Sequence, residues 1–185
     1  MNDSHSSVRL ARTLLYVVRY VMVSIWLGGL VLLGTNVAPL IFRNVPAPTS
    51  ADAMTLVFMR FDRFAVASGI MLLAVEIASA LNARAALQAP NLLGTWRVLL
   101  ASAALVSRLI EAAWLAPAIA SLHRNGAVRG LGTLGETLAR LHGWAEASGK
   151  IEVGLLLAYI GIVAWSESCP IPGSVPASAG PIGTK

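Results

Sequence analysis

Charged residues are scarce in this sequence. Asp, Glu, Lys and Arg make up 12% of the 185 residues, whereas hydrophobic residues make up 56%. Soluble domains usually carry about 25% charged residues. The mean hydropathy is +0.70, and a soluble fold could not bury this much apolar surface. The composition therefore predicts an integral membrane protein, and the length favours a single domain.

Cysteine and catalytic motifs are also nearly absent. The one cysteine, Cys169, excludes an intramolecular disulfide and a CxxC metal site. It lies in a segment rich in Pro, Gly and Ser, where no neighbouring group would activate its thiol, so we expect it to be inert. The chain has no GxSxG, phosphate-loop or HExxH motif, so hydrolysis and phosphoryl transfer lack the residues they need. We therefore predict a protein that is not an enzyme and needs no cofactor.

Arginine supplies most of the positive charge. The formal net charge is +5 and the isoelectric point is about 10.1. The arginines flank apolar runs, and they do not form a basic face interleaved with aromatic residues. This distribution favours the headgroups of a lipid bilayer as the partner and argues against nucleic acid.

Four long apolar runs alternate with connections rich in Pro, Asn and Gly. At about 1.5 Å per residue, each run can cross a hydrocarbon core of about 30 Å. The sequence predicts an all-α integral membrane protein, a four-transmembrane-helix antiparallel bundle over 8–166, with spans of about 14–42, 60–87, 95–122 and 136–166. Four prolines after Glu167 predict a disordered C-terminal tail over 167–185. We expect the membrane to tolerate Pro39 and expect Pro117 to kink its helix.

Small residues recur at helical spacing. Ala65 and Gly69 form a small-xxx-small pair, and Ala147, Gly154 and Gly161 recur every seven residues. Such patterns let transmembrane helices approach closely. They predict tight packing within the bundle, or alternatively faces that serve partner subunits.

Several polar side chains fall inside the spans, where each is unfavourable unless it is paired or faces a protein interior. Counted inward from the side of the first and third connections, Glu76 lies roughly 18 Å below Phe64. Arg108 and Glu111 lie roughly 21 Å and 16 Å below Leu122. This count places the polar side chains in one half of the membrane and leaves the other half almost free of charge. The predicted intramembrane polar cluster consists of Asn36, Glu76, Arg108, Glu111, Lys150 and Glu152.

Two interpretations of these charges remain open. Their similar depth makes Glu76 and Arg108 candidates for an ion pair that locks two antiparallel helices in register. Alternatively, the residues of the predicted polar cluster act together as one site. With Glu146 included, its carboxylates outnumber its basic groups by two. A polar half-cavity of this kind would favour protons or a cation, or would keep one carboxylic acid neutral.

The histidines offer a weaker alternative. His142, Glu146 and Lys150 recur every four residues on one helix face, which near a membrane interface usually indicates a solvated edge. The pair His142 and Glu146 would otherwise belong to a metal site. His123 ends the preceding helix on the same side, so a haem between two imidazoles is a further alternative. Two ligands are weak evidence, because stable metal sites need three or four.

Four short motifs are typical of one family of membrane proteins: Trp26-Leu27-Gly28-Gly29, Val37-Ala38-Pro39-Leu40-Ile41-Phe42, Phe61 and Phe64 around Arg63, and Leu141-His142. Through them the sequence resembles the transmembrane protein 205-like family of four-helix membrane proteins, known in bacteria mainly as a domain of unknown function. The resemblance covers about Leu14 to Trp165. It implies a four-helix fold and a membrane location, and it implies no particular activity.

These observations predict a small multi-pass protein of the bacterial inner membrane that handles a cation or protons, as a transporter-like or resistance protein would. The alternative is a non-catalytic accessory subunit of a larger membrane complex, or a homo-oligomer, whose charges and small-residue faces bind its partners.

Overall fold

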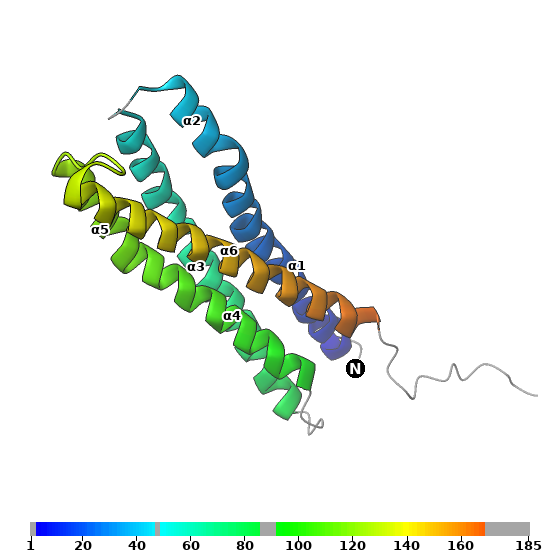
Figure 1. Ribbon diagram of the computed structural model, residues 1–185. Helices are drawn as coiled ribbons and strands as arrows, with labels where there is room; N and C mark the ends of the chain where they lie inside the picture. Colours follow the sequence, from blue (N-terminus) through cyan, green and yellow to red (C-terminus); the bar gives the residue numbers. More distant parts are fainter. Residues whose placement is uncertain (1–2, 47–48, 86–91, 169–185) are drawn as a thin grey trace, which may run out of the picture.

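The computed structural model describes residues 3–46, 49–85 and 92–168, which form four long helical stretches and no strand (Figure 1). The first comprises α1 (Asp3–Leu32) and α2 (Ala38–Asn44), and the second is α3 (Thr49–Ala85). The third comprises α4 (Leu92–Ile110) and α5 (Ala116–Arg124), and the fourth is α6 (Gly132–Ser168). Each contains a run long and apolar enough to cross a membrane, at Thr13–Asn44, Thr49–Ala83, Leu92–Arg124 and Gly132–Ser166. The predicted all-α fold with four transmembrane helices is confirmed.

The helices pack in the order α1, α3, α4, α6, with fewer contacts between α6 and α1. We call the end that carries α2 and the connection between α5 and α6 the loop end, and the opposite end, with the start of α1 and the end of α6, the terminal end (Figure 1). Residues 86–91, which include most of the predicted connection between the second and third spans, and the predicted tail from Cys169 onward lie outside the described residues.

A π-helical turn precedes each proline that interrupts a span. The first covers Leu33–Val37, ahead of Pro39, and the second covers Glu111–Leu115, ahead of Pro117. Proline cannot donate a backbone hydrogen bond, and its ring clashes with the carbonyl four residues earlier. A π-helical turn widens the helix locally, and so accommodates the ring while the helix continues. One consequence is that Glu111 lies in irregular helix.

The buried core is an apolar layer in the middle of the bundle to which all four helical stretches contribute. Trp26 of α1, Leu72 of α3 and Leu156 of α6 are fully buried in it. Large apolar side chains on the outer faces, such as Ile70 and Val106, are instead more than half exposed. Helices that are apolar on all sides are typical of a bundle surrounded by lipid.

Exposed tryptophans mark two levels on the bundle. On α4 and its continuation, Trp96 and Trp114 are 18 residues apart, or about 27 Å. On α6, Trp144 and Trp165 are 21 residues apart, or about 31 Å. Tryptophan concentrates at membrane interfaces, and the hydrocarbon core is about 30 Å thick. We infer that the core of the bilayer lies between these two levels.

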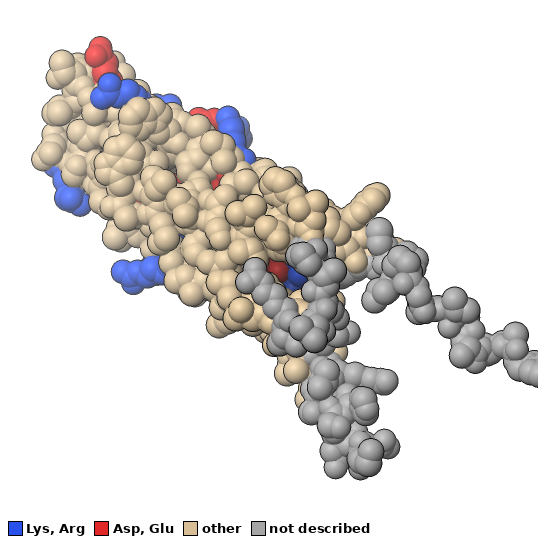
Figure 2. All heavy atoms as spheres, turned by 90° about the horizontal axis from the view of Figure 1, so that it is seen from below, with Lys and Arg blue, Asp and Glu red and all other residues tan. Residues whose placement is uncertain are grey.

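The bundle continues beyond Trp114 and Trp144 at the loop end. Figure 2 shows the basic and acidic side chains of the visible face mainly over the half of the molecule toward the loop end. The exposed charged side chains beyond these tryptophans include Arg124, Arg129, Glu136 and Arg140, which lie between Trp114 and Trp144 in the sequence. The predicted spans 95–122 and 136–166 therefore extend beyond the inferred hydrocarbon core at the loop end.

The small residues of α6 do not pack inside the bundle. Ala147, Gly154 and Gly161 are exposed, and a Cβ added at either glycine would meet no atom within 4 Å. The expectation that this stripe holds the bundle together is wrong, because it lies on the face of α6 opposite the core. Ala65 and Gly69 of α3, by contrast, are buried as predicted, and Gly69 lies against Trp26.

A matched pair of glycines tests the packing of α1 on α3. A Cβ added at Gly29 would overlap the ring of Phe61, whereas one added at Gly28 would meet no atom within 4 Å. Because the ring also lies near Arg108, we expect Gly29→Ala to lower the free energy of unfolding by about 1–3 kcal/mol. Gly28→Ala should not lower it, since alanine favours helix. Denaturant titration of the two variants in detergent measures the difference, and equal stabilities would contradict this packing.

Candidate functional site: two buried charge clusters

Arg108 of α4 lies at the centre of a buried acidic cluster, formed with Asp62, Glu111 and Glu152. Its Nη1 donates to Oδ1 of Asp62 at 2.7 Å. Its Nε and Nη2 donate to the two carboxylate oxygens of Glu152 at 3.0 and 2.7 Å, a bidentate geometry that fixes both side chains. Nη2 also lies 3.5 Å from Oε2 of Glu111. Three carboxyl groups thus share one guanidinium, and the side chains of Arg108 and Glu152 are 1% and 0% exposed.

Neighbouring side chains hold this cluster in place. The indole Nε1 of Trp26, from α1, donates to Oε1 of Glu152. The ring of Phe61 lies 5.5 Å from the guanidinium carbon of Arg108. A hydrogen bond of 3.0 Å joins the hydroxyls of Ser107 and Ser148 and links α4 to α6 at this level. All four helical stretches therefore help to position the acidic cluster.

Glu111 is the least satisfied member of the acidic cluster. It begins the π-helical turn before Pro117, and its side chain is 14% exposed. Its Oε2 is buried and has no hydrogen-bond partner among the described residues, although Arg108 lies within ion-pair distance. A buried carboxylate oxygen without a donor is unfavourable. The charge on Glu111 is therefore only partly compensated.

A second cluster, which we call the basic cluster, lies toward the terminal end and is formed by Arg19, Glu76, Arg97 and Tyr159. Oε1 of Glu76 accepts hydrogen bonds from Nε of Arg19 at 2.5 Å and from the Tyr159 hydroxyl at 2.6 Å. Nε of Arg97 lies 3.1 Å from Oε2 of Glu76, at ion-pair distance but without hydrogen-bond alignment. Two guanidinium groups here share one carboxylate, the reverse of the balance in the acidic cluster.

An apolar layer separates the two clusters. Asp62 and Glu76 are 14 residues apart on α3, or about 21 Å, and Glu152 and Tyr159 are seven apart on α6, or about 10 Å. The core described above, with Trp26, Leu72, Leu105 and Leu156 among its members, lies between them. In the part of the chain that the structure describes, no chain of polar contacts joins the clusters.

The predicted ion pair between Glu76 and Arg108 is wrong. Each belongs to a different cluster, with different partners. Depth was counted from Phe64 on one helix and from Leu122 on the other, and these residues do not lie at the same level. Asp62, next to Phe64 in sequence, pairs with Arg108, which is 14 residues from Leu122. The expectation that one membrane half is almost free of charge is also wrong, because the basic cluster lies there.

Besides Glu76, two residues of the predicted polar cluster lie away from the acidic cluster. Lys150 pairs with Glu146 at 2.7 Å on the outside of α6, with the two side chains 76% and 63% exposed. Asn36 is exposed in the first π-helical turn and donates to the hydroxyl of Thr35. The structure therefore brings together Arg108, Glu111 and Glu152, and it leaves out Lys150, Asn36 and Glu76.

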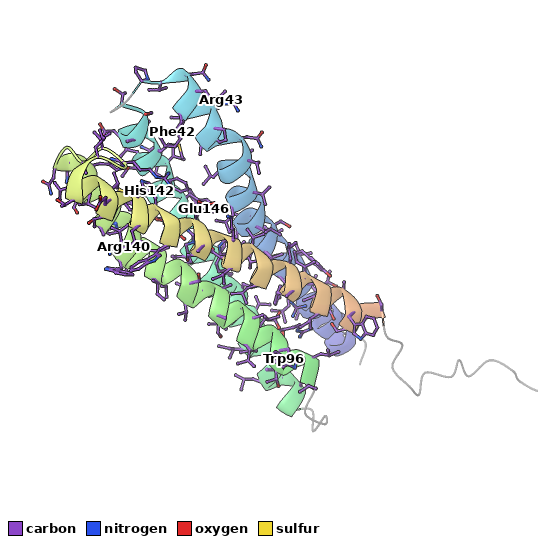
Figure 3. The ribbon with its side chains drawn as sticks, viewed as in Figure 1. Phe42, Arg43, Trp96, Arg140, His142 and Glu146 are labelled. Atoms are coloured by element: carbon purple, nitrogen blue, oxygen red, sulfur yellow. The ribbon has the colours of Figure 1, made fainter. Side chains whose placement is uncertain are left out.

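The two histidines meet near the loop end. The rings of His123 and His142 lie edge to face, with centroids 5.8 Å apart. Figure 3 shows His142 and Glu146 on α6 toward the loop end, with Trp96 near the other end of the bundle. Within residues 3–46, 49–85 and 92–168, no three His, Cys, Asp or Glu side chains are grouped so that they could hold a metal ion. The pair therefore adds no support to the metal and haem alternatives.

Several partners were not identified from the sequence: Asp62, Trp26, Arg19, Arg97 and Tyr159. Asp62 lies among aromatic and charged residues, a composition that is also typical of a segment at the membrane interface. A signal was available, since Asp62, Ala65, Gly69, Leu72 and Glu76 follow one another at intervals of three and four residues and share one helix face. A helix face that holds small residues between two carboxylates indicates that both carboxylates are buried.

Comparison with known proteins supplies a family and no activity. No curated protein and no solved structure matches the chain. A family model described as a domain of unknown function (DUF4149) matches residues 21–127. The match includes Asp62, Arg108 and Glu111 of the acidic cluster and Glu76 and Arg97 of the basic cluster, and it leaves out Arg19, Glu152 and Tyr159. Nothing tests the narrower resemblance to the transmembrane protein 205-like family, which stays a prediction. Because the match covers more than half of the sequence, the chain belongs to the DUF4149 family, with four candidate membrane-spanning helices.

Proposed function

We propose that the acidic cluster binds and releases a proton at membrane depth, and that the chain is a small proton-handling protein of the bacterial inner membrane. The observation that carries the proposal is the convergence of three carboxyl groups on Arg108, which leaves Glu111 Oε2 buried without a hydrogen bond. Fully ionised, the cluster would hold two uncompensated negative charges in a low-dielectric setting. Protonation of one carboxyl group removes one charge and creates a hydrogen-bond donor.

A proton fits this arrangement better than a metal cation does. Hard cations require several oxygen ligands that converge on one point. Here the carboxyl groups of Asp62, Glu111 and Glu152 surround a guanidinium instead. Among the described residues, no three His, Cys, Asp or Glu side chains are arranged so that they could bind one metal ion. A proton needs only one carboxylate oxygen.

The position of Glu111 supports exchange of the proton with the loop end. Glu111 lies three residues from Trp114, or about 5 Å along the helix from the inferred interface. On the other side of the cluster, the core with Leu72 and Leu156 blocks a polar route to the terminal end. Transport across the membrane would therefore require a second conformation, and the π-helical turn that carries Glu111 is the irregular segment nearest to the cluster.

The Glu111→Gln variant tests the proposal. A carboxamide keeps the size of the side chain but cannot gain or lose this proton. We expect the wild-type protein in liposomes to show a pH-dependent infrared band of a protonated carboxyl group, and we expect the variant to lose it. Glu146→Gln, at an exposed carboxylate on α6, is the matched control and should keep the band. A band that is absent from the wild type, or unchanged in Glu111→Gln, would contradict proton binding at Glu111.

The outer face of α6 favours a second candidate function, that of a subunit in a larger assembly. Exposed Ala147, Gly154 and Gly161 form a smooth stripe, and Glu146 and Lys150 place an exposed ion pair beside it, on the inner side of Trp144. Charges that face lipid are unfavourable, so a second copy of the chain that exchanges these ion-pair partners would stabilise them. A fixed oligomer on purification, with no titrating carboxyl band, would favour this function over proton handling.

A further inference from the structure

A groove runs along the outside of α3, next to the π-helical turn of the third span. It has a volume of about 470 Å³ and is lined by Met59, Asp62, Arg63, Val66, Ala67, Ile70 and Ala112. Pockets for small-molecule ligands usually measure about 300–1,000 Å³ and combine apolar walls with a few polar groups. This groove has both features, and it opens on the surface of the bundle that faces lipid.

The groove carries one negative and one positive group that retain bonding capacity. Oδ1 of Asp62 accepts from Arg108, and the structure gives Oδ2 no hydrogen bond within the described residues. Arg63 is exposed and forms no ion pair with any described residue. A ligand that offers both an ammonium and an anion would satisfy Asp62 and Arg63 together.

The apolar part of the groove lies deeper in the membrane than this charged part. Ala112 is two residues from Trp114 at the inferred interface. Ile70 is seven residues from Arg63 along α3, in the direction of the terminal end, or about 10 Å deeper. The groove is therefore polar near the interface and apolar toward the bilayer centre, as a phospholipid in the same leaflet is.

We propose that this groove binds an aminophospholipid of the phosphatidylethanolamine class. The ammonium donates to Asp62, the phosphate accepts from Arg63, and an acyl chain lies against Val66 and Ile70. A choline headgroup has no N–H to donate, and phosphatidylglycerol has no cation for Asp62. The site shares Asp62 with the acidic cluster, but it does not depend on proton binding by Glu111.

Competition between lipids tests the proposal. Native mass spectrometry of the full-length protein, released from micelles with equal amounts of phosphatidylethanolamine, phosphatidylcholine and phosphatidylglycerol, measures which lipid remains bound. We expect phosphatidylethanolamine to be retained about tenfold over phosphatidylcholine, since one charge-assisted hydrogen bond distinguishes them. The Arg63→Gln variant should bind much less phosphatidylethanolamine, because the phosphate loses its cationic partner. Glu111→Gln should keep the retention, which separates this test from that of the proposed function.

A pair of exposed alanines on α3 locates the binding site. Ala67→Trp fills the groove, while Ala74→Trp adds the same side chain at an exposed position that does not line it. We expect Ala67→Trp alone to abolish the retention. Equal retention of all three lipids, or an equal effect of both tryptophans, would show ordinary annular lipid and overturn the proposal. Preference for phosphatidylglycerol would overturn it in favour of an anionic lipid. A dimer that Ala67→Trp dissociates would identify a second copy as the occupant.

Discussion

Replacing Arg108 with methionine is expected to lower the free energy of unfolding by about 3–5 kcal/mol, as removal of one partner from a buried ionic group generally does. The carboxyl groups of Asp62, Glu111 and Glu152 would lose the only guanidinium that contacts them among the described residues. Arg108→Lys should recover only part of the loss, because an ammonium cannot reproduce the bidentate bond to Glu152. Unfolding in mixed detergent micelles, followed by tryptophan fluorescence, measures these changes.

Double variants distinguish the observed partners of Arg108 from the predicted one. Adding Glu152→Gln to Arg108→Met removes one of the uncompensated charges, so the double variant should be more stable than the sum of the single effects implies. For the double variant of Arg108→Met and Glu76→Leu, the loss in the free energy of unfolding should equal the sum of the two single losses within about 0.3–0.5 kcal/mol. The reason is that Glu76 lies in the other cluster. Recovery by Glu76→Leu, without recovery by Glu152→Gln, would contradict the arrangement described above.

The fold was predictable because the length and composition of an apolar run determine whether it can cross a bilayer. Four such runs specify four helices, and the positions of Pro, Gly and Asn indicate the connections. The presence of Arg108, Glu111 and Glu152 at membrane depth was also predictable, since charged residues inside apolar runs are evident from the sequence alone. These features depend on one helix at a time.

Partner choice was not predictable, because it depends on how far each helix is shifted along its neighbour. Asp62 meets Arg108 only because α3 enters the membrane close to Asp62, whereas the third span continues well beyond the membrane through α5. Arg19 and Arg97 were taken for flanking charges, although both side chains turn inward to Glu76. No count of residues from a loop supplies these axial shifts, and the two π-helical turns change them further.

Replacing Glu76 with leucine is the second large effect that we expect, a loss of about 3–5 kcal/mol in the free energy of unfolding. Glu76 is the only carboxylate that contacts Arg19 and Arg97 in the described structure, and its side chain is 1% exposed. Its removal would leave two cations in a largely buried site and would deprive the Tyr159 hydroxyl of its acceptor. The same fluorescence-detected unfolding measures the loss.

The partner variants determine which cation makes Glu76 necessary. The Arg19 side chain is 4% exposed and that of Arg97 is 15% exposed, so Arg97 can turn toward the headgroups more readily. Adding Arg19→Met to Glu76→Leu should therefore restore more stability than adding Arg97→Met, since it removes the more deeply buried charge. Glu76→Gln keeps an acceptor for Tyr159, so its free energy of unfolding should fall less than that of Glu76→Leu. Full stability of Glu76→Leu alone would mean that Arg19 and Arg97 find other partners, and the basic cluster would then not hold α1, α3 and α4 together.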